Sequence, residues 1–441
     1  MLILGAGCSN EYPTSIPMAR ECAQVAHAAL LQDGVLAEGD CLDPSDLSAV
    51  ADAVWTKTGQ QRPLVEHLPL SEFRHSEPNE GYLAAAALLR ERALAAVVTL
   101  NYDLTISHGL AAVTSSAPVE ELAGLADHYR LSTANVIYLH RNVNSGPEEW
   151  VMRTAVLAQG WRGGWEEMIA SAVLVTPVTV FVGLGSRATV LIETVIRIRQ
   201  ALQSGIETFQ VDTDVFGGSA FTAVAGINED RYVRMGWSAF MADLGQRVVN
   251  EHLATVVTAA QQFSERENIR LEQIANDCDL LRHSGLVGLG RMRARWFLDR
   301  FNYVRCRDTR PEWTADVLLG IALVERVLGA EARFSESGLV EFDRHGVVIA
   351  SVLVGHGMGD YRWASLETRM RLEVARRFTG DQAPNWILLL GHVGPPSMTS
   401  LPESLVGEAD VNDVVRGPST IRFLSVDELR ADENAAQKLA S

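Results

Sequence analysis

Leu2-Ile3-Leu4-Gly5-Ala6-Gly7-Cys8-Ser9 opens the chain with three apolar residues that run into two glycines and a serine. An apolar run that ends in glycine indicates a buried strand entering a tight turn. Glycines at such a turn let the backbone approach a diphosphate, which the serine hydroxyl and main-chain N–H groups can bind. Sterics alone can also require these glycines. The dehydrogenase fingerprint has a third glycine that opens a helix, whereas this chain has none at Asn10. The stretch predicts a strand and turn, with Gly5, Ala6, Gly7 and Ser9 as candidate phosphate ligands.

Further apolar runs follow this strand and alternate with helical segments. We expect strands at 96–101, 136–140, 178–183, 208–212 and 232–235, helices at 17–31, 80–96 and 189–203, and an irregular helical segment at 44–70. Strands that are apolar on both faces and separated by helices are typical of a parallel sheet sandwiched by helices. The predicted fold class is therefore α/β, a doubly wound, Rossmann-like parallel sheet with helical insertions.

Polar side chains stand at or just past the exits of these strands. They are Ser9, Asn101, Asp103, His140, Ser186 and Asp212. In doubly wound sheets, ligands bind at the carboxyl ends of the strands. These residues are therefore the first candidates for a binding or catalytic site.

The chemistry of three of these residues suits a sugar substrate. Asn101 can hold a water and a ribose hydroxyl, and Asp103 can accept from sugar hydroxyls or a carboxamide. An Asx turn that ends the strand is the alternative for both. His140 can act as a general base near neutral pH, and the alternative is a structural histidine paired locally through either nitrogen.

A second glycine pair, Gly183-Leu184-Gly185-Ser186, precedes the expected helix at 189–203. Ser186 fits a helix N-cap, and the same terminus could present N–H donors to a phosphate or an adenosine ribose. Asp212, at the end of the next strand, could accept from that ribose or initiate a turn.

Composition excludes several classes of protein. The net charge of −17 argues against a protein whose main task is to bind nucleic acid. The five cysteines are scattered without a C-x-x-C pair, which argues against structural zinc and a disulfide framework. The start carries no basic leader, and the apolar stretch at 169–185 is interrupted by Pro177 and hydroxyl residues, so we expect no membrane span and a cytoplasmic location.

The order of the motifs resembles the sirtuin superfamily. It comprises G-A-G-x-S at 5–9, T-x-N-x-D at 99–103, L-H at 139–140 and G-x-G-S at 183–186. The segment Ile16-Pro17-Met18-Ala19-Arg20 is similar to the sirtuin I-P-x-x-R segment, and 231–244 resembles the closing segment of bacterial sirtuin-like domains. The resemblance covers residues 1–248, which we take as one domain.

The sequence differs from protein-deacylating sirtuins in three respects. Protein-deacylating sirtuins carry a zinc module with two cysteine pairs after the catalytic histidine, whereas 141–178 contains no cysteine. Arg141 follows the histidine where they have glycine, and Leu100 stands where they have glutamine. The chain is thus similar to the zinc-free sirtuin-like domains of bacterial antiphage defence proteins, which hydrolyse NAD.

This resemblance implies an NAD glycohydrolase that releases nicotinamide and ADP-ribose without zinc, and that depletes NAD in abortive infection. It implies a catalytic role for Asn101, His140 and Asp103. It implies NAD binding by Gly5, Ala6, Gly7, Ser9, Pro17, Gly183, Gly185, Ser186 and Asp212. Homo-oligomerisation and a co-encoded partner, such as a translocase-type ATPase, follow from the same resemblance. An NAD-dependent deacylase and a non-enzymatic NAD or ADP-ribose sensor are the alternatives.

The region 249–441 is expected to form a second α/β domain for sensing, partner docking or oligomerisation. We expect helices at 251–283, 288–303, 315–328 and 365–378, and strands at 339–342, 347–354, 386–391 and 420–424. Glu341-Phe342-Asp343 suggests a metal-dependent nuclease, but that site needs a lysine, and none lies between Lys57 and Lys438.

Overall fold

The chain forms two compact units. The computed structural model describes residues 1–113, 119–159, 176–184, 207–218, 220–267, 269–296, 311–356, 372, 374–379, 382–390 and 422–425. The first unit comprises Met1–Val113 and Pro118–Leu244, and the second continues from Gly245. No helix within these ranges is both long enough and apolar enough to span a bilayer.

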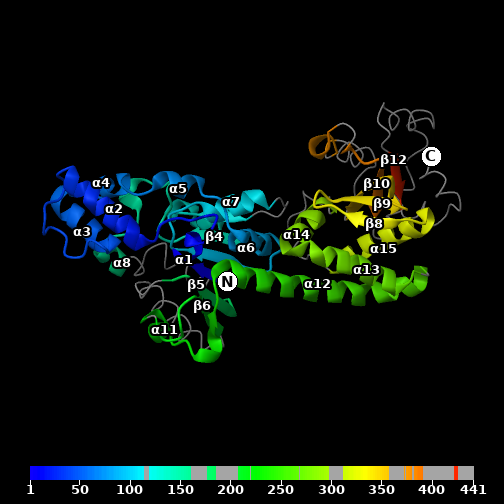
Figure 1. The fold of residues 1–441 in the computed structure, drawn as a ribbon, viewed down its shortest axis with the longest axis horizontal. Helices are drawn as coiled ribbons and strands as arrows, with labels where there is room; N and C mark the ends of the chain where they lie inside the picture. Colours follow the sequence, from blue (N-terminus) through cyan, green and yellow to red (C-terminus); the bar gives the residue numbers. More distant parts are fainter. Residues whose placement is uncertain are drawn as a thin grey trace. The chain divides into compact units, whose positions relative to one another are not determined.

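The first unit is built on a seven-stranded sheet in which every neighbouring pair is parallel. Its strands are β1 (Leu2–Leu4), β2 (Ala96–Thr99), β3 (Glu120–Leu122), β4 (Asn135–Tyr138), β5 (Val178–Val182), β6 (Glu207–Asp212) and β7 (Tyr232–Arg234), in the order β3-β4-β2-β1-β5-β6-β7. Helices flank this sheet (Figure 1). The prediction of a doubly wound parallel sheet is confirmed.

The central strand β1 sets the position of the site. Leu2, Ile3 and Leu4 are completely buried, and they pair with β2 on one side and β5 on the other. From β1 the chain builds outward through β2 and β4 in one direction and through β5, β6 and β7 in the other. The sheet therefore reverses its winding between β1 and β5, where doubly wound folds open a crevice for ligands.

Between β1 and β2 the chain inserts a run of helices, and the second to the fifth of them share a core of their own. The helices are α1 (Gly7–Asn10), α2 (Ala19–Gln32), α3 (Leu47–Thr58), α4 (Arg62–Glu66), α5 (Leu70–His75) and α6 (Glu80–Arg90), and α2, α3 and α4 gather with the later α8 (Thr154–Gln159) (Figure 1). Asp46 begins α3 as an N-cap that accepts from Ser48 N, and Gly59 ends it with φ of 70°.

Two elements of the first unit differ from their predicted form. The helix expected at 80–96 ends at Arg90, because Arg92 is left-handed (φ 59°) and Ala93 N turns back to Leu88 O. The edge strand β3 was not predicted, because its two glutamates give it no apolar run. The helices α7 (Thr105–Ala112) and α11 (Ala220–Ala225) are the other described α-helices that lie wholly within this unit, and the helix expected at 189–203 lies outside the described residues.

The second unit combines helices with a five-stranded sheet. Its described elements are α13 (Leu271–His283), α14 (Gly285–Trp296), α15 (Pro311–Leu328), β8 (Glu331–Phe334), β9 (Leu339–Arg344), β10 (Val347–His356), β11 (Trp386–Leu390) and β12 (Arg422–Ser425), with α12 (Trp237–Glu267) running into it. The order is β12-β11-β10-β9-β8, antiparallel from β8 to β10 and parallel from β10 to β12.

Two expectations for the second unit need correction. The helix expected at 251–283 is two helices, because Ile269 N bonds to Ser264 O and ends the first. The strand β8 went unrecognised because it is short and lies at the sheet edge. Asp343, which suggested a nuclease, accepts from Gly346 N in the β9–β10 turn and pairs with Arg333.

One helix of the second unit, α13, carries a buried acidic side chain. Asp277 on α13 is 3% exposed, and its Oδ2 has no hydrogen-bond partner among the residues that the structure describes. The nearby Glu325 uses both carboxylate oxygens to accept, from Gln273 Nε2 at 2.5 Å and Ala332 N at 2.7 Å. Burial, and then the charge of Glu325, raise the pKa of Asp277 to about 8.

This raised pKa predicts a pH-dependent gain in stability for Asp277→Asn. In the unfolded chain Asp277 ionises near pH 4, but in the folded chain it ionises only near pH 8. Raising the pH through this window therefore favours unfolding, by at most about 1.4 kcal/mol per pH unit, and asparagine removes that penalty. In urea unfolding of the full chain, the advantage of the variant should grow from pH 5.5 to pH 8. An advantage that does not vary with pH would contradict the assignment.

Candidate active site

The turn after β1 packs directly against the turn after β5. Gly5 N donates to Val182 O at 2.9 Å, and Gly7 N donates to Gly183 O at 3.1 Å. A Cβ on Gly5 would lie 2.4 Å from Gly183 O, and one on Gly7 would lie 2.9 Å from Gly183 Cα. Gly183 itself is left-handed, with φ of 59°. The steric alternative therefore accounts for these glycines, since the two backbones could not approach so closely otherwise.

This contact changes what the turn can offer to a ligand. The N–H groups of Gly5 and Gly7 bond within the protein, so they are not free to cradle a phosphate. Across the part of the chain that the structure describes, the N–H of Ala6 has no such backbone acceptor. Ala6 is thus the main-chain donor of this turn that a ligand could use.

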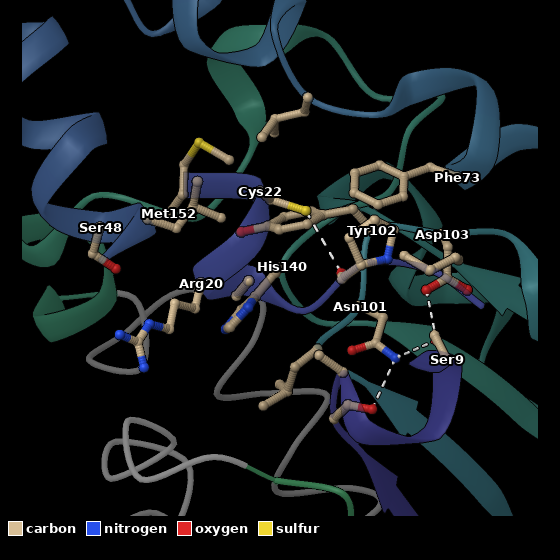
Figure 2. Close-up of a pocket in the computed structure, with 18 of the residues that line it drawn as sticks. Ser9, Arg20, Cys22, Ser48, Phe73, Asn101, Tyr102, Asp103, His140 and Met152 are labelled. Carbon is tan, nitrogen blue, oxygen red and sulfur yellow. Dashed lines mark hydrogen bonds between the residues drawn. The ribbon is translucent and has the colours of Figure 1, made fainter. Parts of the chain in front are cut away.

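A cavity of about 510 Å³ opens at the exits of β1, β2 and β4. We call it the first cavity. Seven of the residues predicted from the sequence line it, namely Gly5, Ala6, Ser9, Pro17, Asn101, Asp103 and His140. Asn101 and His140 lie on the same side of the cavity, with the amide of Asn101 facing the imidazole (Figure 2).

Ser9 is the centre of a buried hydrogen-bond network behind the cavity wall. Its Oγ donates to Asp103 Oδ2 at 2.8 Å and accepts from Asn101 Nδ2 at 3.0 Å. Asn101 Nδ2 also donates to Gly5 O at 3.0 Å, and Asp103 Oδ1 accepts from Thr105 N at 3.0 Å. With its amino group held twice, Asn101 turns its carbonyl oxygen toward the cavity and His140 (Figure 2).

Tyr82 belongs to this network and was not predicted as a site residue. Its hydroxyl lies 2.7 Å from Ser9 Oγ, and the side chain is 1% exposed. Because the single Ser9 proton goes to Asp103, the Tyr82 hydroxyl must donate to Ser9. The sequence held one weak signal for it, a lone tyrosine in an alanine-rich helix behind the N-cap Asn79.

The acidic candidate Asp103 and the basic candidate His140 both have pKa values shifted from the ordinary values of their side chains. Burial raises the pKa of Asp103, which its hydrogen bonds from Thr105 and Ser9 only partly offset. The pKa of His140 is lowered to about 4, chiefly by burial and also by the charge of Arg141, while a hydrogen-bonding contact with the Leu100 backbone opposes the shift. His140 is therefore neutral at pH 7 and available as a proton acceptor.

Aromatic rings fix the wall next to His140. Tyr102 stacks on Trp150 with ring centroids 4.5 Å apart, and its hydroxyl donates to Val151 O at 2.9 Å. The centroid of the His140 ring lies 6.3 Å from that of Tyr102. His140 is directly followed by Arg141 in a left-handed conformation (φ 74°), which costs a non-glycine residue roughly 1–2 kcal/mol.

Arg20 adds a positive charge to the first cavity. It lies at the start of α2, is exposed, and lines the cavity together with Ser45, Asp46 and Ser48 near the start of α3. Within the described ranges no ion pair joins it to an acid. From this segment the sequence predicts Pro17 alone as a binding residue.

A second cavity of about 410 Å³ opens on the other side of the glycine contact, at the exits of β5 and β6. Gly7, Gly183 and Asp212 line it, and Leu184 lines both cavities. Asp212 is half-buried, and its Oδ1 accepts from Asp214 N at 3.3 Å. The remaining predicted residues, Gly185 and Ser186, lie outside the described residues.

Glu11 shapes one wall of the second cavity by capping α12. Its carboxylate accepts from Trp237 N at 2.5 Å and Ser238 N at 2.9 Å. A negative charge at a helix N-terminus is favourable, because it faces unpaired N–H groups. Within the described ranges, no group of three or more His, Cys, Asp or Glu side chains is placed to hold a metal ion.

Comparison with known proteins gives only distant similarities. No family model matches the chain, and no curated protein sequence matches it. Solved structures of Sir2 proteins do match. A mutant Sir2 homologue with ADP-ribose is 16% identical, covering 55% of this chain and 89% of its own, with a TM-score of 0.32. A Sir2 homologue with NAD is 16% identical, covering 55% of this chain and 86% of its own, with a TM-score of 0.31. A Sir2 protein with a propionylated peptide is 15% identical, covering 57% of this chain and 91% of its own, with a TM-score of 0.29.

The buried network predicts that Tyr82→Phe destabilises the protein. The variant removes the hydroxyl that donates to Ser9 and should lower the free energy of unfolding by about 1 kcal/mol. Tyr12→Phe is the matched control, because Tyr12 is 88% exposed. Urea unfolding of both variants measures the difference. Equal stability of the two would show that the Tyr82 hydroxyl contributes nothing to the network.

Proposed function

We propose that this chain hydrolyses NAD at the nicotinamide–ribose bond and releases nicotinamide and ADP-ribose. The observation that carries the proposal is the shared cavity of Asn101 and His140, which opens beside the glycine contact between the exits of β1 and β5. An acceptor oxygen and a neutral imidazole on one cavity wall suit the activation of a water or a sugar hydroxyl.

The two cavities suit the two halves of a dinucleotide. In this proposal the nicotinamide ribose occupies the first cavity and the adenosine occupies the second, where Asp212 accepts from its ribose. The diphosphate crosses the glycine contact near Leu184, which lines both cavities. Ala6 N–H and the positive charge of Arg20 are the groups that would compensate its negative charge.

The reaction needs little acid catalysis, because nicotinamide leaves as a neutral molecule. The C1′–N bond breaks, its electron pair neutralises the pyridinium ring, and the ribose becomes oxocarbenium-like. A water held by Asn101 Oδ1 bonds to C1′, and His140 accepts the proton that this water loses. Asp103 acts through Ser9, which it anchors, and so keeps the Asn101 amide in position.

NAD-dependent deacylation is a second candidate that one observation favours. Beyond the polar wall, the first cavity is lined largely by apolar side chains. They include Ile16, Leu47, Leu68, Phe73, Val151, Met152 and Leu157. An acyl chain would fit such a lining, and formation of acyl-ADP-ribose with an acylated peptide would identify this reaction. NAD binding without turnover would instead identify a sensor.

An NAD hydrolase needs restraint, since constant depletion of NAD would kill its host. We therefore propose a role in antiphage defence by abortive infection. The second unit would act in sensing, in partner docking to a protein such as a translocase-type ATPase, or in homo-oligomerisation.

The proposal predicts that Asn101→Ala and His140→Ala each abolish nicotinamide release without loss of fold. Each variant removes one of the two groups that activate water. Purified protein, with and without its co-encoded partner, is incubated with NAD, and nicotinamide is followed by chromatography. Asn144→Ala and His75→Ala are the controls, because both side chains are exposed and lie outside the cavity lining. Full turnover by either cavity variant, where the wild type is active, would remove the assignment.

A further inference from the structure

Arg141 occupies a backbone conformation that suits glycine rather than arginine. The described non-glycine residues with positive φ are Ser15, Arg92, Arg141 and His345. Arg92 follows the end of α6 and His345 lies in the β9–β10 turn, and neither is adjacent to a residue that lines the first cavity. Arg141 directly follows His140, which lines the first cavity. Backbone strain next to a candidate site points to function.

The segments on both sides of Arg141 impose this conformation. Arg141 N donates to Tyr138 O and closes the turn that carries His140, while Val143 N returns the chain to Tyr102 O at 2.8 Å. Two further bonds, Leu139 N to Thr99 O at 2.9 Å and Val151 N to His140 O at 3.2 Å, fasten the turn to its neighbours. Residue 141 must therefore be left-handed whatever its side chain, and glycine would meet this demand without strain.

An arginine at a position that suits glycine implies that its side chain contributes something. Arg141 does not line the first cavity, so its guanidinium does not act on a ligand there. Its charge acts on His140, whose pKa it lowers in addition to the larger effect of burial. The other ionisable groups that line this cavity are Arg20 and Cys22 on α2, Asp46 before α3, and Tyr102 and Asp103 after β2.

We propose that Arg141 is a positioning residue for His140, because the strained turn at Arg141 holds the imidazole at the cavity wall. The charge of the Arg141 guanidinium supports the same role, since it disfavours a second positive charge on the neighbouring ring. Its meaning for catalysis rests on the proposed function. The nicotinamide ring of NAD is cationic, so a protonated His140 would repel it and could not accept a proton from water. The coupling of the two side chains is a property of the free protein and can be measured without NAD.

Histidine NMR of the full chain tests this coupling directly. The Cε1–H resonance of His140, assigned by its loss in His140→Asn, is titrated in the wild type and in Arg141→Gly and Arg141→Lys. The titration midpoint should rise by about one pH unit in the glycine variant, which lacks the charge, and stay unchanged in the lysine variant. Arg92→Gly is the matched control, because it relieves the same backbone conformation beyond the end of α6 and should leave the midpoint unchanged.

The proposal would be overturned if the titration midpoint of His140 in Arg141→Gly equalled that of the wild type. It would also be overturned if Arg141→Lys shifted the midpoint as much as Arg141→Gly does. If the glycine variant does not fold, Arg141→Asn replaces it, because asparagine tolerates the left-handed region. As the pH is lowered, the rate of nicotinamide release from NAD should begin to fall at a higher pH in Arg141→Gly than in the wild type, because His140 is protonated earlier. A shifted midpoint in a protein that never releases nicotinamide would contradict the proposed function and leave the coupling intact.

Discussion

The close approach of two backbone turns, after β1 and after β5, is the constraint on which the rest of the site depends. Gly5, Gly7 and Gly183 touch where any Cβ would collide, at the point where the sheet reverses its winding. The contact divides the crevice expected there into two cavities that share Leu184. The N–H groups of Gly5 and Gly7 donate to backbone oxygens in this contact, so they are not available to a ligand.

Burial behind this contact determines the chemistry of the first cavity. The Ser9 network satisfies the amino group of Asn101 and both oxygens of Asp103 inside the protein, which leaves the Asn101 carbonyl oxygen for a ligand. The same burial favours uncharged side chains and keeps His140 neutral. A site with a fixed acceptor and a neutral base suits a reaction whose substrate is positively charged at the bond that breaks.

The sequence predicted the sheet and the strand exits because both depend on local patterns. Apolar runs identify β1, β2, β4, β5 and β6, and the residue after each run lies at the carboxyl edge. Tyr82 was not predicted, because its partner Ser9 lies 73 positions away and the one local signal, a lone tyrosine in an alanine-rich helix, does not identify that contact. The steric use of Gly5 was one of two alternatives, and only the position of Gly183 decides between them. The strain at Arg141 depends on bonds to Tyr102 and Thr99, which come from another strand exit.

The most direct test of the account is a crystal structure of the wild-type chain with carba-NAD, whose nicotinamide cannot be cleaved from its ring. The account predicts that the nicotinamide-bearing ring, the carbocycle that replaces the ribose, lies within hydrogen-bond reach (about 2.6–3.2 Å, directly or through one water) of both Asn101 and His140. It also predicts adenosine in the second cavity, beside Asp212. A nicotinamide-bearing ring that reaches only one of these two side chains, or an adenosine in the first cavity, would contradict it.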